Sequence, residues 1–65
     1  MKIEYKTLDG IVRVKDFVDV KDFIRQQDLE VPALDDSAKV KEVTINGAVY
    51  DFKGNIADLY FKLSR

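Results

Sequence analysis

One pattern occurs twice in the amino-acid sequence: strand-like alternation around a glycine-containing turn, followed by helical spacing. Apolar and polar side chains alternate on both sides of Asp9-Gly10 and again on both sides of Asn46-Gly47. Such alternation is typical of a β-hairpin closed by a type I′ turn, which needs positive φ at both central residues. A period of 3.6 follows each hairpin and is typical of an amphipathic helix. Because such helices must bury their apolar stripes against the sheet, the pattern predicts a layered fold.

The first turn sets the register of the first hairpin. If the loop consists of Asp9 and Gly10 alone, Leu8 lies opposite Ile11. One face of this hairpin is then predicted to face the core, and it consists of Ile3, Tyr5, Thr7, Val12 and Val14. The other face carries most of the charge, and its apolar side chains are Leu8, Ile11 and Phe17.

The second hairpin follows the same rule. Ile45 is predicted to lie opposite Ala48 across its two-residue turn. Val49 and Thr44 then lie on the face away from the core, in the place equivalent to that of the apolar pair in the first hairpin.

Two helices are predicted, one over residues 20–28 and one from residue 56 to the end of the chain. Asp19 and Asn55 precede them, where an N-cap side chain accepts backbone N–H bonds. The first helix must end before Pro32, because the residue before a proline avoids the α region. Each helix presents one stripe at i, i+3, i+4 and i+7, and the two stripes are Val20, Phe23, Ile24 and Gln27, and Ile56, Leu59, Tyr60 and Leu63.

These elements predict an α+β fold with the order ββα-ββα. We expect a two-layer sandwich in which two helices cover one face of a four-stranded, mainly antiparallel sheet. A length of 65 residues leaves room for a single domain, residues 1–65. The pattern does not decide the strand order, nor whether the halves arose by duplication or by using the same turn and cap chemistry twice.

The chain contains no cysteine and no histidine. Their absence removes thiolate nucleophiles, zinc–sulfur sites and Ser-His-Asp chemistry. An enzyme built from this chain would need Asp, Glu, Lys or Tyr as its acid and base, with a pKa shifted by burial that so small a domain rarely provides. The enzymatic hypothesis has one pair of carboxylates, Asp51 and Glu42, which are predicted to occupy neighbouring positions. Asp35-Asp36 in the connector is more typical of a turn than of a Ca²⁺ loop. We expect no enzymatic activity, no cofactor and no metal.

The charges are balanced and spread along the chain. Eleven basic residues and twelve acidic residues give a net charge of −1. Nucleic-acid binding usually needs a basic excess on one surface, so it is disfavoured. No apolar run is long enough for a transmembrane helix, and we expect a cytoplasmic protein without a membrane partner.

Exposed apolar side chains are the remaining functional signal. Phe61 falls outside the stripe of the second helix, and the outer sheet face collects apolar residues from both hairpins. The candidate partner surface is Phe61, Leu8, Ile11, Phe17 and Val49. The function stays unknown, but we predict a non-enzymatic module that binds an unknown protein partner or forms a homodimer. The competing interpretations are that these side chains are covered within the fold or are ordinary surface residues.

A second functional hypothesis remains open. Four cations of the two hairpins could form a charged sheet face that binds nucleic acid, and these are Lys6, Arg13, Lys15 and Lys53.

Three segments, residues 41–47, 50–54 and 58–60, carry a family resemblance. They read Lys-Glu-Val-Thr-Ile-Asn-Gly, Tyr-Asp-Phe-Lys-Gly and Asp-Leu-Tyr. In these segments the chain resembles a family of short uncharacterised proteins of streptococci, lactobacilli and related Gram-positive bacteria. The resemblance implies a small cytosolic bacterial protein and transfers no activity and no site.

Residues 1–10 resemble the first hairpin of ubiquitin-type β-grasp domains. The ending at residues 63–65 lacks the diglycine that conjugation requires, and a helix is predicted where that fold has its last strand. We therefore expect no modifier function.

Overall fold

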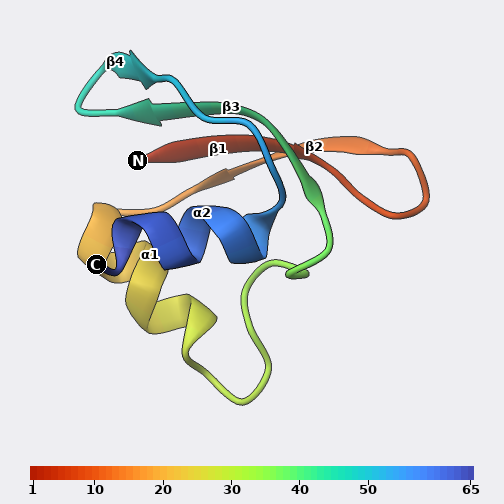
Figure 1. Cartoon of the computed structure of the whole chain (residues 1–65), viewed down its shortest axis with the longest axis horizontal. Coiled ribbons are helices and arrows are strands. Elements are labelled where there is room, and N and C mark those ends of the chain that lie inside the picture. Colours follow the sequence, from red (N-terminus) through yellow and green to blue (C-terminus); the bar gives the residue numbers. More distant parts are fainter.

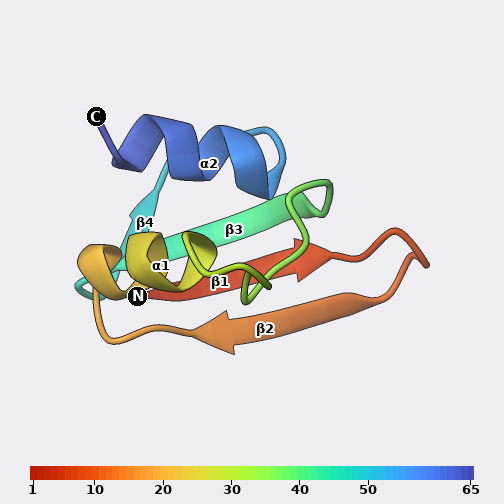
Figure 2. The ribbon, with the colours of Figure 1, turned by 90° about the horizontal axis from the view of Figure 1, so that it is seen from below.

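The computed structural model describes residues 1–65 and contains the elements in the predicted order (Figure 1). The strands are β1 (Lys2–Lys6), β2 (Val12–Asp16), β3 (Lys39–Ile45) and β4 (Ala48–Tyr50), and the helices are α1 (Val20–Gln27) and α2 (Ile56–Leu63). The four strands form one antiparallel sheet in the order β2-β1-β3-β4. Both helices lie on the same face of this sheet (Figure 2). The predicted α+β fold is confirmed, and the strand order makes β2 and β4 the two edges.

The second hairpin has the predicted turn. Asn46 and Gly47 both have positive φ, 53° and 79°. Ile45 accordingly pairs with Ala48. Positive φ at both central residues is the requirement of a type I′ turn, and asparagine and glycine tolerate that conformation.

Both helices begin at the predicted caps. The Asp19 side chain accepts a hydrogen bond from the backbone N–H of Asp22 at 2.8 Å. The Asn55 side chain accepts one from the N–H of Asp58 at 2.8 Å, and the Asp58 carboxylate accepts one from the N–H of Asn55 at 3.4 Å. The caps satisfy N–H groups of the first turn that have no partner within the helix.

The first hairpin differs from the prediction by one residue. Its loop has three residues rather than two, because Thr7 lies opposite Ile11: the Thr7 N–H donates to the Ile11 carbonyl at 2.8 Å, and the Gly10 N–H donates to the Thr7 carbonyl at 2.9 Å. Gly10 has positive φ, 86°, and Asp9 does not. A glycine in the left-handed region at the end of a three-residue loop is a common hairpin closure. As a result Glu4 lies opposite Val14.

This shift turns all of β2 over, because side chains alternate between the two faces of a strand. Val12 and Val14 were predicted to face the core, but they lie on the face without helices and are each 50% exposed. Arg13 and Lys15 lie on the helix side instead. Phe17 was predicted on the outer face and is buried, with only 5% of its surface exposed.

The core lies between the two helices and the central strands. Its nine buried apolar residues are Ile3, Phe17, Phe23, Leu34, Ala38, Val40, Val43, Ile56 and Leu59. Phe17 packs edge-on against Phe23, with ring centroids 5.3 Å apart and an interplanar angle of 73°. No residue of β2 belongs to this core, since all five are exposed.

A buried glutamine holds the connector between α1 and β3. The Gln27 side chain accepts a hydrogen bond from the Leu34 N–H at 2.8 Å and donates one to the Leu34 carbonyl at 3.1 Å. Both residues are buried. One amide therefore satisfies both backbone groups of a connector residue that the core covers.

Candidate protein-interaction surface

Strand β2 forms an open edge of the sheet. It runs along the side of the molecule that neither helix covers (Figure 2), and each of its five residues is exposed. The opposite edge, β4, has only three residues. The Lys62 ammonium from α2 lies 5.3 Å from the ring centroid of Tyr50 in β4 and 5.7 Å from that of Phe52 just beyond it. Of the two edges, β2 is the longer and the one that no helix approaches.

The backbone of β2 leaves hydrogen-bonding groups unpaired along this edge. Two residues flank the strand, and both bond to the chain beside β1: the Ile11 carbonyl accepts from the Thr7 N–H, and the Phe17 N–H donates to the Met1 carbonyl. In an antiparallel ladder the bonding direction alternates, so Arg13 and Lys15 also point their backbone groups at β1. The N–H and C=O groups between them point outward, and they belong to Val12, Val14 and Asp16.

The two faces of β2 present different chemistry. Val12 and Val14 are half exposed on the face without helices, beside Lys6 and Glu4 of β1. A hollow of about 100 Å³ on this face is lined by Lys2, Glu4, Val14, Glu42 and Thr44. The open face therefore combines an apolar edge with a charged centre.

The helix-side face of β2 carries two cations without an acidic partner. Arg13 lies opposite Tyr5, and Lys15 lies opposite Ile3. The ion pair that the structure contains joins Arg25 to Asp22, with 2.7 Å between nitrogen and oxygen. Lys15 instead stands 6.0 Å from the ring centroid of Phe17. The charges of Arg13 and Lys15 thus remain available to an external group.

The five predicted surface residues do not form one surface. Leu8 is exposed in the first turn, and Ile11 is half exposed just before β2 begins. Val49 is exposed on the open face, but it lies on β4, which is separated from β2 by both β1 and β3. Phe61 is 58% exposed on α2, in the helix layer, where the Arg65 guanidinium lies 4.3 Å from its ring centroid. Phe17 is buried and is not part of a surface.

Sequence reasoning missed Val12 and Val14, because the assumed two-residue turn placed them in the core. A signal for the correct register exists in the turn itself. A three-residue loop needs positive φ at its last residue only, and glycine favours that conformation. Gly10 is therefore compatible with a three-residue loop as well as with a type I′ turn.

The four cations of the nucleic-acid hypothesis do not share a face. Lys6 lies on the open face with Val12, while Arg13 and Lys15 lie on the other face of the sheet. Lys53 follows β4, in the segment that leads to α2. No continuous basic surface is formed by the four.

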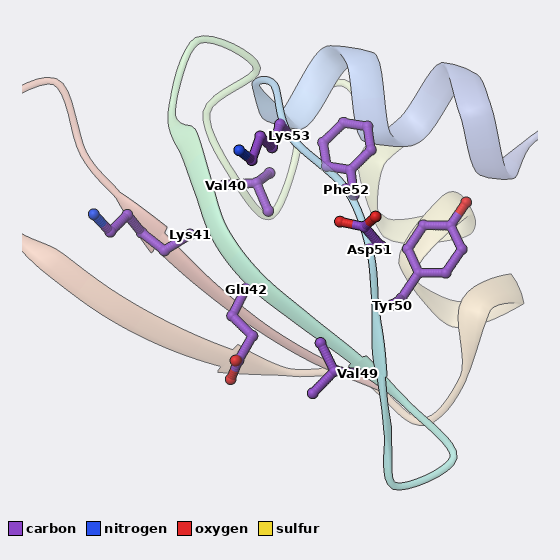
Figure 3. Close-up of a pocket in the computed structure, with 8 residues that line it drawn as sticks. All are labelled: Val40, Lys41, Glu42, Val49, Tyr50, Asp51, Phe52 and Lys53. Carbon is purple, nitrogen blue, oxygen red and sulfur yellow. The ribbon is translucent and has the colours of Figure 1, made fainter.

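A larger hollow lies where β4 leaves β3 (Figure 3). It measures about 360 Å³ and is lined by Val40, Lys41, Glu42, Val49, Tyr50, Asp51, Phe52 and Lys53. β4 ends at Tyr50, and the chain returns to β3 at Gly54, whose carbonyl accepts a hydrogen bond from the Val40 N–H at 2.9 Å. Asp51 and Glu42 both line this hollow, and both residues are exposed.

The two side chains whose pKa is clearly shifted, Asp22 and Tyr60, belong to the helices. The pKa of Asp22 is lowered to about 2, first by the hydrogen bond from the Val18 N–H and then by those from Arg25 and Gln26. The pKa of Tyr60 is raised, because its hydroxyl donates a hydrogen bond to an aspartate carboxylate at the end of α1. Neither group lies on β2.

The fold and this surface define a small open-faced α+β domain with one uncovered edge strand. The chain belongs to the family described as "Domain of unknown function (DUF4649)", whose model matches residues 1–65. It is similar to the crystal structure of a conserved domain protein from Streptococcus pneumoniae TIGR4, with a TM-score of 0.79 and 28% sequence identity over 98% of this chain and 88% of that chain. No curated protein matches the chain.

These findings confirm the resemblance to an uncharacterised streptococcal family that the second half of the sequence predicted. The family description assigns no function. None of the helices has the length and apolar character that crossing a membrane would require.

Proposed function

We propose that this chain is a non-enzymatic protein-interaction module of the bacterial cytoplasm, and that it binds its partner by accepting a strand of that partner along β2. The observation that carries the proposal is the exposure of β2 on both faces together with its outward-pointing backbone groups. Addition of a strand to an open sheet edge is a recurrent mode of peptide recognition, in which main-chain hydrogen bonds supply affinity and alternate side chains supply specificity.

The composition of β2 also supports this choice of surface. An edge strand is usually protected by being short, covered or charged. β2 is five residues long and uncovered, and on its open face it displays Val12 and Val14. Arg13 and Lys15 protect the edge from indiscriminate pairing, so a partner has to supply groups that match them.

Nucleic acid is the weaker candidate. Phosphate contacts need cations gathered along one surface. The four cations considered for this role are divided between the two faces of the sheet and the segment after β4.

The test uses a photo-cross-linking residue introduced at Asp16, at the end of β2, in the cells that produce the protein. Val14→Pro removes an N–H that points to the free edge and leaves the bonds to β1 in place. Val14→Ala is the matched control, because it shortens the side chain and keeps the N–H. We expect a partner protein to be cross-linked by the parent chain and by Val14→Ala, but not by Val14→Pro.

A cross-linker at Lys21, exposed on α1, measures the background. Circular dichroism spectra establish that both Val14 variants are folded. Cross-linking that is unchanged by Val14→Pro, or that gives the same products from Lys21, would contradict the proposal.

A further inference from the structure

We infer, on the basis of the proposed function, that the strand bound by β2 alternates acidic and apolar side chains, with acidic residues facing Arg13 and Lys15 and apolar residues facing Val12 and Val14. The partner would thus present an extended segment of the form acidic–apolar–acidic. The inference follows from the register of β2 and from the charges that the chain leaves unpaired.

The direction of the backbone hydrogen bonds of β2 determines which of its side chains lie closest to the side chains of a partner strand. Val12, Val14 and Asp16 point their backbone groups at the free edge, so an antiparallel partner strand forms its hydrogen-bonded pairs there. Arg13 and Lys15 fall at the intervening, non-hydrogen-bonded positions. Side chains of such pairs lie closer together, which makes the charge of the residue facing Arg13 or Lys15 the most selective feature of the partner.

The two cations have no carboxylate opposite them in the chain. Their cross-strand neighbours in β1 are Tyr5 and Ile3. A basic partner residue would repel them, whereas an acidic one would form an opposite-charge cross-strand pair. Both cations are exposed and lie on the helix side, where neither helix covers β2 (Figure 2).

The open face of β2 favours apolar side chains on the partner strand. Val12 and Val14 lose water contact when an apolar side chain packs opposite them, and each has half of its surface left to bury. Because side chains alternate along the partner as well, its apolar positions fall between its acidic ones.

A second copy of this chain is a poor occupant of the same edge. If two β2 strands pair antiparallel with all helices on one side of the joined sheet, residues of equal parity lie opposite each other. In the three registers that overlap β2 most, like charges meet on the helix side. Arg13 meets Lys15 when the twofold axis passes through Val14, and the cation on the axis meets its own copy when the axis passes through Arg13 or through Lys15. Like charges directly opposite destabilise strand pairing, and this favours a different, acidic partner.

The experiment titrates the ¹⁵N-labelled chain with a capped synthetic peptide, Thr-Val-Glu-Val-Glu-Val-Thr, at low salt. Two control peptides replace both Glu residues by Gln or by Lys. We expect the Glu peptide to shift the amide resonances of Val12, Val14 and Asp16, and to bind about tenfold more tightly than the Gln peptide. Added salt should weaken the binding of the Glu peptide and leave the affinity of the Gln peptide unchanged.

Charge reversal supplies the second arm. The double variant Arg13→Glu with Lys15→Glu should lose the preference for the Glu peptide and prefer the Lys peptide. Because both residues are exposed, the urea midpoint of the double variant should match that of the parent chain. Lys21→Glu, on the outside of α1, is the matched control and should leave the preference unchanged.

The outcomes separate this inference from the proposed function. Equal shifts of the β2 amides by all three peptides would overturn the acidic preference while leaving strand addition intact. Failure of every peptide would overturn the inference, and the cross-linking experiment would then decide on strand addition. Sedimentation that shows a dimer of the free chain, abolished by Val14→Pro, would also overturn it, because the occupant would be a second copy.

Discussion

Truncation of Gln27 to alanine is the sharpest test of how the connector is held. The variant leaves the N–H and C=O of Leu34 without their side-chain partner, at a residue that is 3% exposed. A buried backbone group left unpaired costs about 1–3 kcal/mol. If water reaches one of the two groups after truncation, the other still lowers the free energy of unfolding by about 1–3 kcal/mol.

That loss is large for a chain of this size, whose total stability is expected to be about 3–10 kcal/mol. The assay is urea unfolding followed by far-ultraviolet circular dichroism, with the midpoint and slope fitted together. Gln26→Ala is the matched control. The Gln26 side-chain amide donates to Asp22 on the same helix. Gln26 bonds the connector only through its backbone carbonyl, which accepts from the Ala33 N–H and is kept in this variant.

Gln27→Glu adds a second readout. A carboxylate can accept the Leu34 N–H but cannot donate to the Leu34 carbonyl, and Asp36 lies within 3.4 Å of the native amide nitrogen. We expect this variant to be destabilised at neutral pH and to recover part of the loss when the new carboxyl is protonated. A loss below about 1 kcal/mol for Gln27→Ala, equal to that of Gln26→Ala, would refute the assignment of the connector's anchoring to this amide.

Three further predictions address the helices and the core. The lowered pKa of Asp22 means that its carboxylate stabilises the fold above pH 3.8 and that this contribution is lost as the pH falls towards about 2; the difference in thermal midpoint between the parent and Asp22→Asn should therefore shrink over that range, and a constant difference would contradict the role of the carboxylate. Gly54→Ala should lower the unfolding free energy by about 1–3 kcal/mol in urea, because φ is 143° and the new Cβ would lie 3.1 Å from both Phe52 and Asp58; an unchanged midpoint would show that the site relaxes. Phe17→Ala should cost about 3–5 kcal/mol and the exposed Phe61→Ala less than about 0.5 kcal/mol in the same assay; equal losses would place Phe61 in the core.

The helices and the second hairpin were predictable because their signals are local. The side chains of Asp19 and Asn55 each accept a hydrogen bond from an N–H group three residues further along the chain, so each cap depends only on residues close in sequence. Asn46 and Gly47 both tolerate positive φ, which leaves one favourable turn. At the two helix caps and at this turn, residues close in sequence determine the conformation.

The face of β2 was not predictable from the same kind of signal. Asp9-Gly10 fits a two-residue turn and also the end of a three-residue loop, and the two differ by one residue of register. The choice is settled by burial: the three-residue loop places Phe17 over Phe23 in the core, whereas the shorter one would expose Phe17. The strand order depends likewise on pairing between β1 and β3, which are far apart in the sequence.

The three-residue loop also separates the residues that stabilise the core from the residues of the edge strand β2. By turning Phe17 inward, it anchors the end of the first hairpin in the core and leaves β2 itself outside the core. Substitutions of Arg13 or Lys15 then change the charge of the edge without opening a cavity, whereas truncation of Phe17 opens a cavity in the core and destabilises the domain. Under the proposed strand addition, the charge of the edge strand can therefore change, and with it the strand that the edge accepts, while the core stays the same.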